Sequence, residues 1–176
     1  MIDEELLRLA WRQLNKKAAA GIDQVTAQEY GQDLEARLND LIDRLKRNGY
    51  RAKLVKRALI PKGEGKTRAL GIPVLEDRLL QKAVSMILEA VYESTFLECS
   101  FGYRPGKDAK MAIKELRDEL NFGDYSYVVE ADIKGFFDTL NHDQLIAMLE
   151  LRIEDKKLIR LIRKWLNAGI MDTDGK

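Results

Sequence analysis

The residues best suited to catalysis lie in an apolar segment late in the chain. Alternation of residue types predicts a strand over 127–133, with Glu130 and Asp132 on one face. Burying two unpaired carboxylates at a strand end is costly, so they need water, a cation or a basic partner. Asp132 is therefore a candidate ligand for a hard divalent cation, which prefers oxygen donors. A solvent-exposed strand end with a salt bridge would explain the same pattern.

Two aromatic residues follow this segment directly, in Lys134-Gly-Phe-Phe-Asp138. Phe136 and Phe137 should point in different directions, so we expect at least one to pack in the core and the other to be free to line a pocket. His142, the only histidine, is expected to be a polar surface residue at the start of a helix. One histidine and one cysteine exclude a multi-histidine metal site and an intrachain disulfide.

The net charge of +1 conceals a strong segregation of charge. Residues 44–68 hold ten Lys or Arg and one acid, a net +9, while the rest of the 176-residue chain carries −8. Such a field can steer polyanions. Lys53, Lys56 and Arg57 are thus candidate nucleic-acid contacts. A solvated helix end followed by a hairpin is the plainer interpretation.

The same stretch contains the pattern of a hairpin. Strands are predicted at 54–60 and 67–72, with the turn at Gly63-Glu-Gly65. Lys62 and Arg68 flank this turn, and both side chains suit phosphate oxygens. Further on, Tyr103-Arg104 offers an aromatic face beside a cation, which suits base stacking and phosphate contact.

Helical periodicity dominates the rest of the chain, so the predicted class is α+β. Thr26 and Glu29 have capping-box spacing, Gly49 is predicted as a C-cap, and Asp108 and Asn141 as N-caps. No apolar run is long enough for a membrane helix and no secretory signal is visible, which predicts a cytoplasmic protein without membrane partners. The predicted helices are 3–17, 26–48, 76–93, 108–120, a short one from 141, and 155–167.

Six motifs occur in an order that resembles the reverse transcriptases of bacterial group II introns. Reverse transcriptases of CRISPR-associated and other bacterial retroelement classes share much of this pattern. The motifs are Ala20-Gly-Ile-Asp23, Ile60-Pro-Lys62, Arg68-Ala-Leu-Gly-Ile-Pro73, Glu76-Asp-Arg78, Phe101-Gly-Tyr-Arg-Pro-Gly106, and Glu130-Ala-Asp-Ile-Lys-Gly-Phe-Phe-Asp138 with Asn141-His-Asp143.

The resemblance implies the fingers and first part of the palm of a right-hand polymerase, mostly helical with a small antiparallel fingers hairpin and one palm strand. Its implied regions are a helical N-terminal extension (1–48), fingers (49–125) and a partial palm (126–176), in one contiguous fold. The implied substrates are an RNA template, a DNA primer and dNTPs, with Mg²⁺ or Mn²⁺ as cofactor.

The resemblance also implies roles for individual residues. Lys62 and Arg68 match the residues that hold the triphosphate of the incoming nucleotide. Asp132 and the Ile133 carbonyl match the first metal ligands of the palm. Phe137 matches the aromatic gate beneath the sugar, which disfavours a 2′-hydroxyl.

Later family motifs, Pro-Gln-Gly and Tyr-Ala-Asp-Asp, are missing. Two-metal phosphoryl transfer needs carboxylates from two strands, and Asp172 and Asp174 are poor substitutes for the second set. We therefore expect the chain to be inactive by itself. A non-catalytic RNA-binding module is the competing hypothesis. The expected exposed strand edge also predicts a homodimer through residues 127–176, with a monomer in which residues 155–176 fold back as the alternative.

Overall fold

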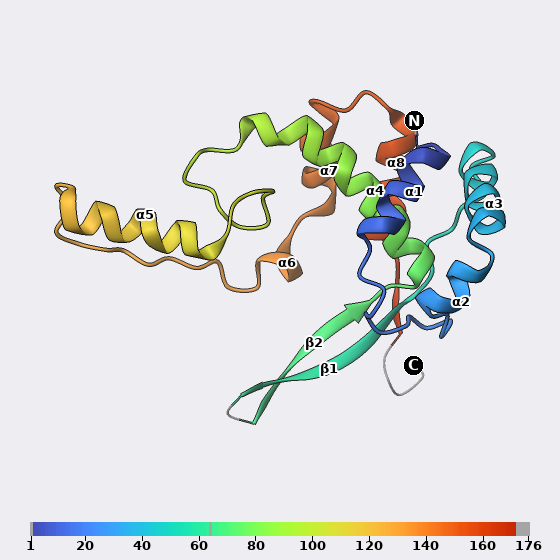
Figure 1. Ribbon diagram of the computed structural model, residues 1–176, viewed down its shortest axis with the longest axis horizontal. Coiled ribbons are helices and arrows are strands. Elements are labelled where there is room, and N and C mark those ends of the chain that lie inside the picture. Colours follow the sequence, from blue (N-terminus) through green and yellow to red (C-terminus); the bar gives the residue numbers. More distant parts are fainter. Residues whose placement is uncertain (1, 64, 172–176) are drawn as a thin grey trace. The chain divides into compact units, whose positions relative to one another are not determined.

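The computed structural model describes residues 2–63 and 65–171 and divides into two compact units. Unit 1 comprises Met1–Ile87 with His142–Lys176, and unit 2 comprises Leu88–Asn141. The expected regions 1–48, 49–125 and 126–176 stay a prediction. The content of helices and one small sheet agrees with the α+β class (Figure 1).

Unit 1 holds most of the helices and the whole sheet. Its elements in chain order are α1 (Glu4–Gln13), α2 (Ala27–Gln32), α3 (Leu34–Lys46), β1 (Val55–Gly63), β2 (Lys66–Ile72), α4 (Leu75–Tyr92, which crosses into unit 2), α7 (His142–Glu150), α8 (Lys156–Leu166) and β3 (Ile170–Met171).

Unit 2 continues from α4 with η1 (Glu93–Thr95), α5 (Ala109–Phe122) and α6 (Phe136–Thr139). None of its described residues is buried. The buried side chains lie in unit 1, and those with 0% exposure are Leu7, Ala10, Leu38, Leu41, Val74, Leu79, Leu80, Ala83 and Ile146. No described helix combines the length and apolarity needed to cross a membrane.

Local capping sets several of the helix starts that the sequence predicts. Thr26 and Glu29 form the expected reciprocal capping box, which satisfies two backbone N–H groups at the start of α2. Asp108 accepts from the Met111 amide at 2.8 Å and so begins α5. Asp155 accepts from the amides of Lys157 and Leu158 at the start of α8.

The predicted helix over 26–48 is two helices, with the break at Asp33. Gly31 weakens the helix just before the break, and it also leaves room for Trp11, whose ring would lie 3.3 Å from an added Cβ. The end of α3 is a Schellman turn in which Asn48, at φ +57°, takes the left-handed position. The prediction of Gly49 as that residue was one position late, since the Gly49 amide instead donates to the Arg44 carbonyl at 2.7 Å.

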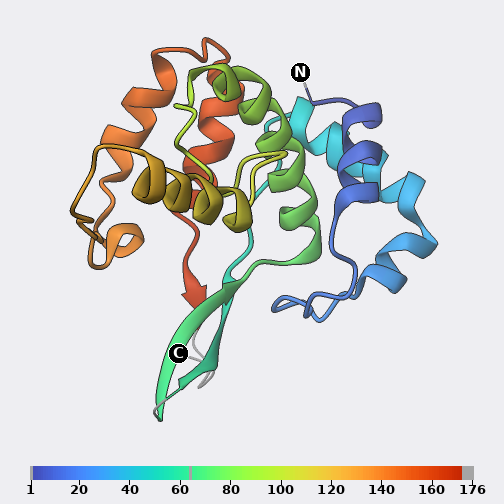
Figure 2. The same cartoon turned by 60° about the vertical axis from the view of Figure 1, so that its left-hand side comes forward.

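The sheet has the order β2-β1-β3. The antiparallel hairpin β1–β2 confirms the predicted pair of strands, and the figures show it as a long ribbon extending from the helices of unit 1 (Figures 1 and 2). Sequence patterns missed β3, which pairs in parallel with β1 at Val55 and Lys56. Two residues are too short to show a strand period.

The predicted strand over 127–133 is wrong. These residues have no regular structure, and they are exposed. A strand needs a neighbouring strand to satisfy its backbone hydrogen bonds, and no described segment pairs with this one. The alternation of residue types over 127–133 therefore reflects β propensity, although no described strand pairs with this segment.

Candidate nucleotide and nucleic-acid interface

The hairpin places Lys62 and Arg68 beside its turn, as predicted. Arg68 lies opposite Ile60, and the ladder shifts register between Pro61 and Gly63, so Lys62 has no opposite residue. Both cations are exposed, and neither forms an ion pair with a described residue. They are therefore available to an anionic ligand.

The turn itself depends on glycine for its backbone angles. Gly63 and Gly65 have φ of +86° and +72°, a region that side chains with a Cβ rarely adopt. An added Cβ at either position would meet nothing within 4 Å, so conformation, and not space, requires these glycines.

The basic stretch 44–68 does not form one continuous cationic surface. The Arg44 guanidinium forms a two-bond ion pair with Glu76, at 3.0 and 2.7 Å, and a further bond to Asp40. Lys53 pairs with Asp23, its Nζ lying 3.1 Å from Oδ2. Part of the +9 charge is therefore neutralised inside unit 1.

The remaining predicted contacts on β1 divide between two faces. Neighbouring residues of a strand point to opposite faces, and directly opposed residues share one. Lys56, opposite Ile72, therefore shares its face with Arg68, whereas Arg57, opposite Gly71, lies on the other face. An added Cβ on Gly71 would come within 2.8 Å of a Val55 methyl, which explains the glycine by packing within the hairpin.

A buried hydrogen-bond network fixes the base of the hairpin. The Tyr50 hydroxyl donates to Asp77 Oδ1 at 2.6 Å and accepts from Trp165 Nε1 at 2.7 Å. The second oxygen of Asp77 accepts from the Lys53 amide at 3.0 Å, just before β1. The pKa of Asp77 is raised, because burial disfavours its charged form more than these hydrogen bonds stabilise it.

Helical periodicity alone does not reveal this hydrogen-bond network, although one signal of it is present in the sequence. Asp77 lies three and seven residues before Leu80 and Val84, which the helical pattern places inward. The same spacing puts Asp77 on the buried face, where a carboxylate needs hydrogen-bond partners. Its partners come from Tyr50 and Trp165, which helical periodicity cannot pair across so many residues.

The segment around Asp132 lies in unit 2 and is open to solvent. Asp132 and Ile133 are exposed and precede Gly135, whose φ of +63° begins the short helix α6. The Phe136 and Phe137 rings meet edge to face with centroids 5.3 Å apart. They are 45% and 84% exposed, so the expectation that one of them packs in the core was wrong.

The described residues do not complete a metal site. No three acidic, histidine or cysteine side chains among them come together as a site for a cation would require. Asp172 and Asp174 lie outside the described residues. Asp132 therefore stands as a single candidate ligand.

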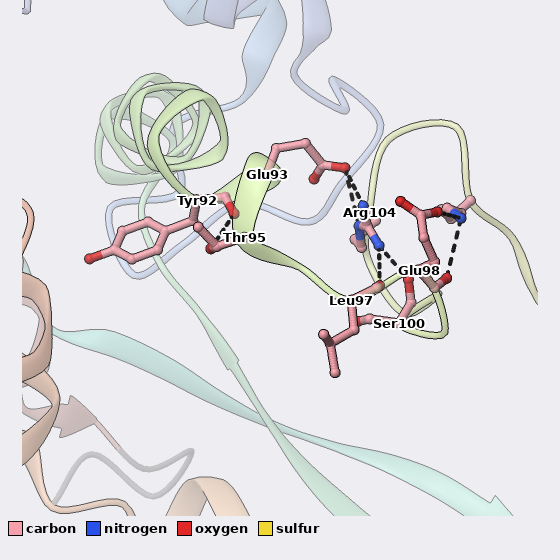
Figure 3. Close-up of polar contacts among 8 residues, drawn as sticks. Tyr92, Glu93, Thr95, Leu97, Glu98, Ser100 and Arg104 are labelled. Atoms are coloured by element: carbon pink, nitrogen blue, oxygen red, sulfur yellow. Dashed lines mark hydrogen bonds and ion pairs between the residues drawn. The ribbon is translucent and has the colours of Figure 1, made fainter.

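Arg104 is held inside its own loop and does not extend toward solvent. Its guanidinium bonds the Glu93 carboxylate through Nε and Nη2, at 3.1 and 2.8 Å. Nη1 donates to the carbonyls of Leu97 and Ser100, at 2.8 and 2.9 Å (Figure 3). Only 7% of the side chain is exposed. This geometry does not support the predicted phosphate contact, whereas the neighbouring Tyr103 is fully exposed.

The predicted residues are thus distributed over both units. The predicted cationic contacts belong to unit 1, and they are Lys53, Lys56, Arg57, Lys62 and Arg68. The aromatic and acidic candidates, Tyr103, Asp132 and Phe137, belong to unit 2 with Arg104 and Ile133.

Comparison with known proteins agrees with the motif order. Residues 60–176 match the family model described as reverse transcriptase (RNA-dependent DNA polymerase). The chain is 40% identical over 139 residues to the group II intron-encoded protein LtrA of Lactococcus lactis, covering 78% of this chain and 23% of that protein. It is 35% identical over 155 residues to protein YkfC of Escherichia coli, covering 86% and 41%.

A third relative is nuclear intron maturase 2, mitochondrial, of Arabidopsis thaliana, 36% identical over 96 residues that cover 54% of this chain and 13% of the relative. The chain thus spans less than half the length of each of these relatives. The family match includes Lys62, Arg68 and the Asp132 motif. The chain belongs to the reverse transcriptase family.

Proposed function

We propose that the intact protein is an RNA-directed DNA polymerase of the group II intron type, with the fingers and part of the palm of a right-hand polymerase in this chain. The observation that carries the proposal is the family match over residues 60–176. The similarity to a group II intron-encoded protein over most of the chain supports the subclass. Its substrates would be an RNA template, a DNA primer and dNTPs.

In this proposal the hairpin binds the triphosphate of the incoming nucleotide. Nucleotide addition forms a bond from the primer 3′-oxygen to the α-phosphorus and releases pyrophosphate, so negative charge grows on the leaving group. Lys62 and Arg68 would neutralise that charge. Lys is a compact point charge and Arg is a rigid fork, and both bind phosphate oxygens. Their freedom from ion pairs with described residues supports this role.

The Asp132 segment has separate roles in this proposal. Asp132 is proposed as the carboxylate that this chain supplies to a divalent cation, Mg²⁺ or Mn²⁺, with the Ile133 carbonyl beside it. Phe137 would lie beneath the sugar, where its ring disfavours a 2′-hydroxyl. Its exposure leaves the ring accessible to a nucleotide.

For the 176-residue chain by itself we infer RNA binding without nucleotide addition. The described residues hold no three-ligand metal cluster, while Lys62 and Arg68 beside the hairpin turn are exposed. Electrostatic contacts with phosphates suffice for binding and need no metal.

Replacing Asp132 by Asn in the intact protein tests the polymerase proposal. Nucleotide addition on a primed RNA template should be abolished while RNA binding stays within about twofold, because Asn keeps the shape but loses the charge that binds a cation. Asp124→Asn, at another exposed aspartate of unit 2, is the matched control and should keep parental turnover. Parental turnover of the Asp132→Asn protein would overturn the assignment.

A further inference from the structure

Tyr103 occupies a conformation that folding alone does not favour. Its φ of +57° lies in the left-handed region, which is costly for a residue with a Cβ and which glycine or asparagine adopts more easily. Its side chain is fully exposed, so no buried contact offsets this cost. An exposed aromatic ring at a strained position suggests an external contact.

The residue that follows holds this conformation in place. Four of the five N–H groups of Arg104 bond to Glu93 and to the carbonyls of Leu97 and Ser100 (Figure 3). The guanidinium also lies 5.2 Å from the Phe96 ring centroid. These hydrogen bonds tie Arg104, the residue after Tyr103, to Glu93 at the start of the loop and to Leu97 and Ser100 in its middle.

A second cation fastens the other side of the loop. Lys107 donates to the Glu98 carboxylate at 2.9 Å and lies 5.2 Å from the Phe101 ring centroid. Pro105 fixes its own backbone angle, and Gly106 takes a φ of +70°. The tip of the loop, residues 102–106, is therefore held on both sides while Tyr103 extends from it.

We propose that Arg104 is a positioning residue that holds Tyr103 as a stacking platform for an unpaired base of single-stranded RNA. This inference rests on the proposed function, because it names a contact of the same nucleic acid. Aromatic rings stack on any base, since every base has a π-face. With four N–H groups committed inside the loop, Arg104 is not placed to contact a phosphate as well.

A double-mutant cycle separates positioning from phosphate contact. The variants are Tyr103→Asn, which suits the left-handed backbone but lacks the ring, Arg104→Lys, which keeps the charge but lacks the fork, and the double variant. Binding of the 176-residue chain to a fluorescent unstructured oligoadenylate is measured by anisotropy at several salt concentrations. Each single variant should bind about tenfold more weakly, and the double variant no more weakly than either.

The salt dependence supplies a readout that a phosphate contact would change. Loss of one phosphate contact with a single strand lowers the log–log salt slope by about 0.7. We expect Arg104→Ala to leave the slope unchanged. Parental affinity for Arg104→Lys, or a lower slope for Arg104→Ala, would overturn the positioning role. Equal effects of Tyr103→Asn and Tyr125→Asn, a control at another exposed tyrosine, would overturn the platform.

Two further measurements keep the test decisive. If Arg104→Lys lowers the melting temperature strongly, Glu93→Gln replaces it, because it weakens the same ion pair from the other side. RNA binding that depends on Lys56 and Arg57 but not on Tyr103 would overturn this inference and leave the proposed function standing. An absence of any RNA binding by the parent chain would overturn both this inference and the RNA binding proposed for the 176-residue chain.

Discussion

The buried network at Tyr50 allows a prediction of stability with a magnitude. Tyr50→Phe removes one oxygen and leaves the ring, so Asp77 Oδ1 and Trp165 Nε1 each lose a partner. Asp77 is only 2% exposed, so water cannot readily replace the hydroxyl. Leaving a buried polar group unsatisfied costs about 1–3 kcal/mol, and more when it is charged. Trp165 is half-buried and can recover some hydration, so the expected loss is about 2–4 kcal/mol.

Urea unfolding followed by far-UV circular dichroism measures this loss. Tyr125→Phe is the matched control, since Tyr125 is 69% exposed, and its effect should lie within about 0.5 kcal/mol. Asp77→Ala should destabilise as well, and the double variant should fall short of the sum, because both changes remove the same bond. A Tyr50→Phe chain as stable as the control would refute the network's contribution to folding.

Four further predictions concern pH, salt, sugar selection and assembly. The pKa of Asp77 is raised in the fold, so the native state binds the carboxyl proton more tightly than the unfolded state does. The chain should therefore lose stability relative to Asp77→Asn as pH rises from below 3.8 through the folded pKa. Urea titrations at several pH values that show the opposite trend would contradict this. Replacing Lys53, Lys56 and Arg57 by alanine should flatten the log–log salt slope for RNA binding by about 1.4 units, because Lys53 is already paired with Asp23 and each of the other two cations contributes about 0.7. A slope equal to the parent's would argue against these contacts. In the intact protein Phe137→Ala should admit ribonucleotides, and primer extension with rNTPs that stays at the parental level would exclude the gate. Sedimentation equilibrium should show a homodimer through residues 127–176. The strand edge is not formed, but the exposed apolar side chains described in this range still favour association. A concentration-independent monomer mass would count against the dimer.

Local signals predicted those parts of the fold that depend on near neighbours in the chain. The capping box at Thr26 and the cap at Asp108 need only residues three positions away. The hairpin turn needs glycines at positive φ, and their spacing was visible. The hairpin cations Lys62 and Arg68 followed from that turn. The motif order then indicated the family, which the comparison confirmed.

Contacts between distant segments determined the rest. The alternation over 127–133 indicates β propensity. A strand forms only where another strand pairs with its backbone N–H and C=O groups, and local sequence does not show whether the fold supplies that partner. Arg104 looked like a phosphate ligand because its sequence shows a cation beside an aromatic ring, while its carboxylate partner, Glu93, lies eleven residues earlier.

The sequence by itself therefore determined which chemical groups are available. They are the cations beside a glycine turn, an acid after an apolar run, and the aromatic ring of Tyr103, which directly follows a loop glycine. Only the tertiary structure decided which charges are free. Hydrogen bonds and ion pairs join residues far apart in the chain, so Arg44, Lys53 and Arg104 are paired within the fold while Lys62 and Arg68 stay exposed. A charge is available to a ligand only when no internal partner satisfies it, and composition does not record where those partners lie.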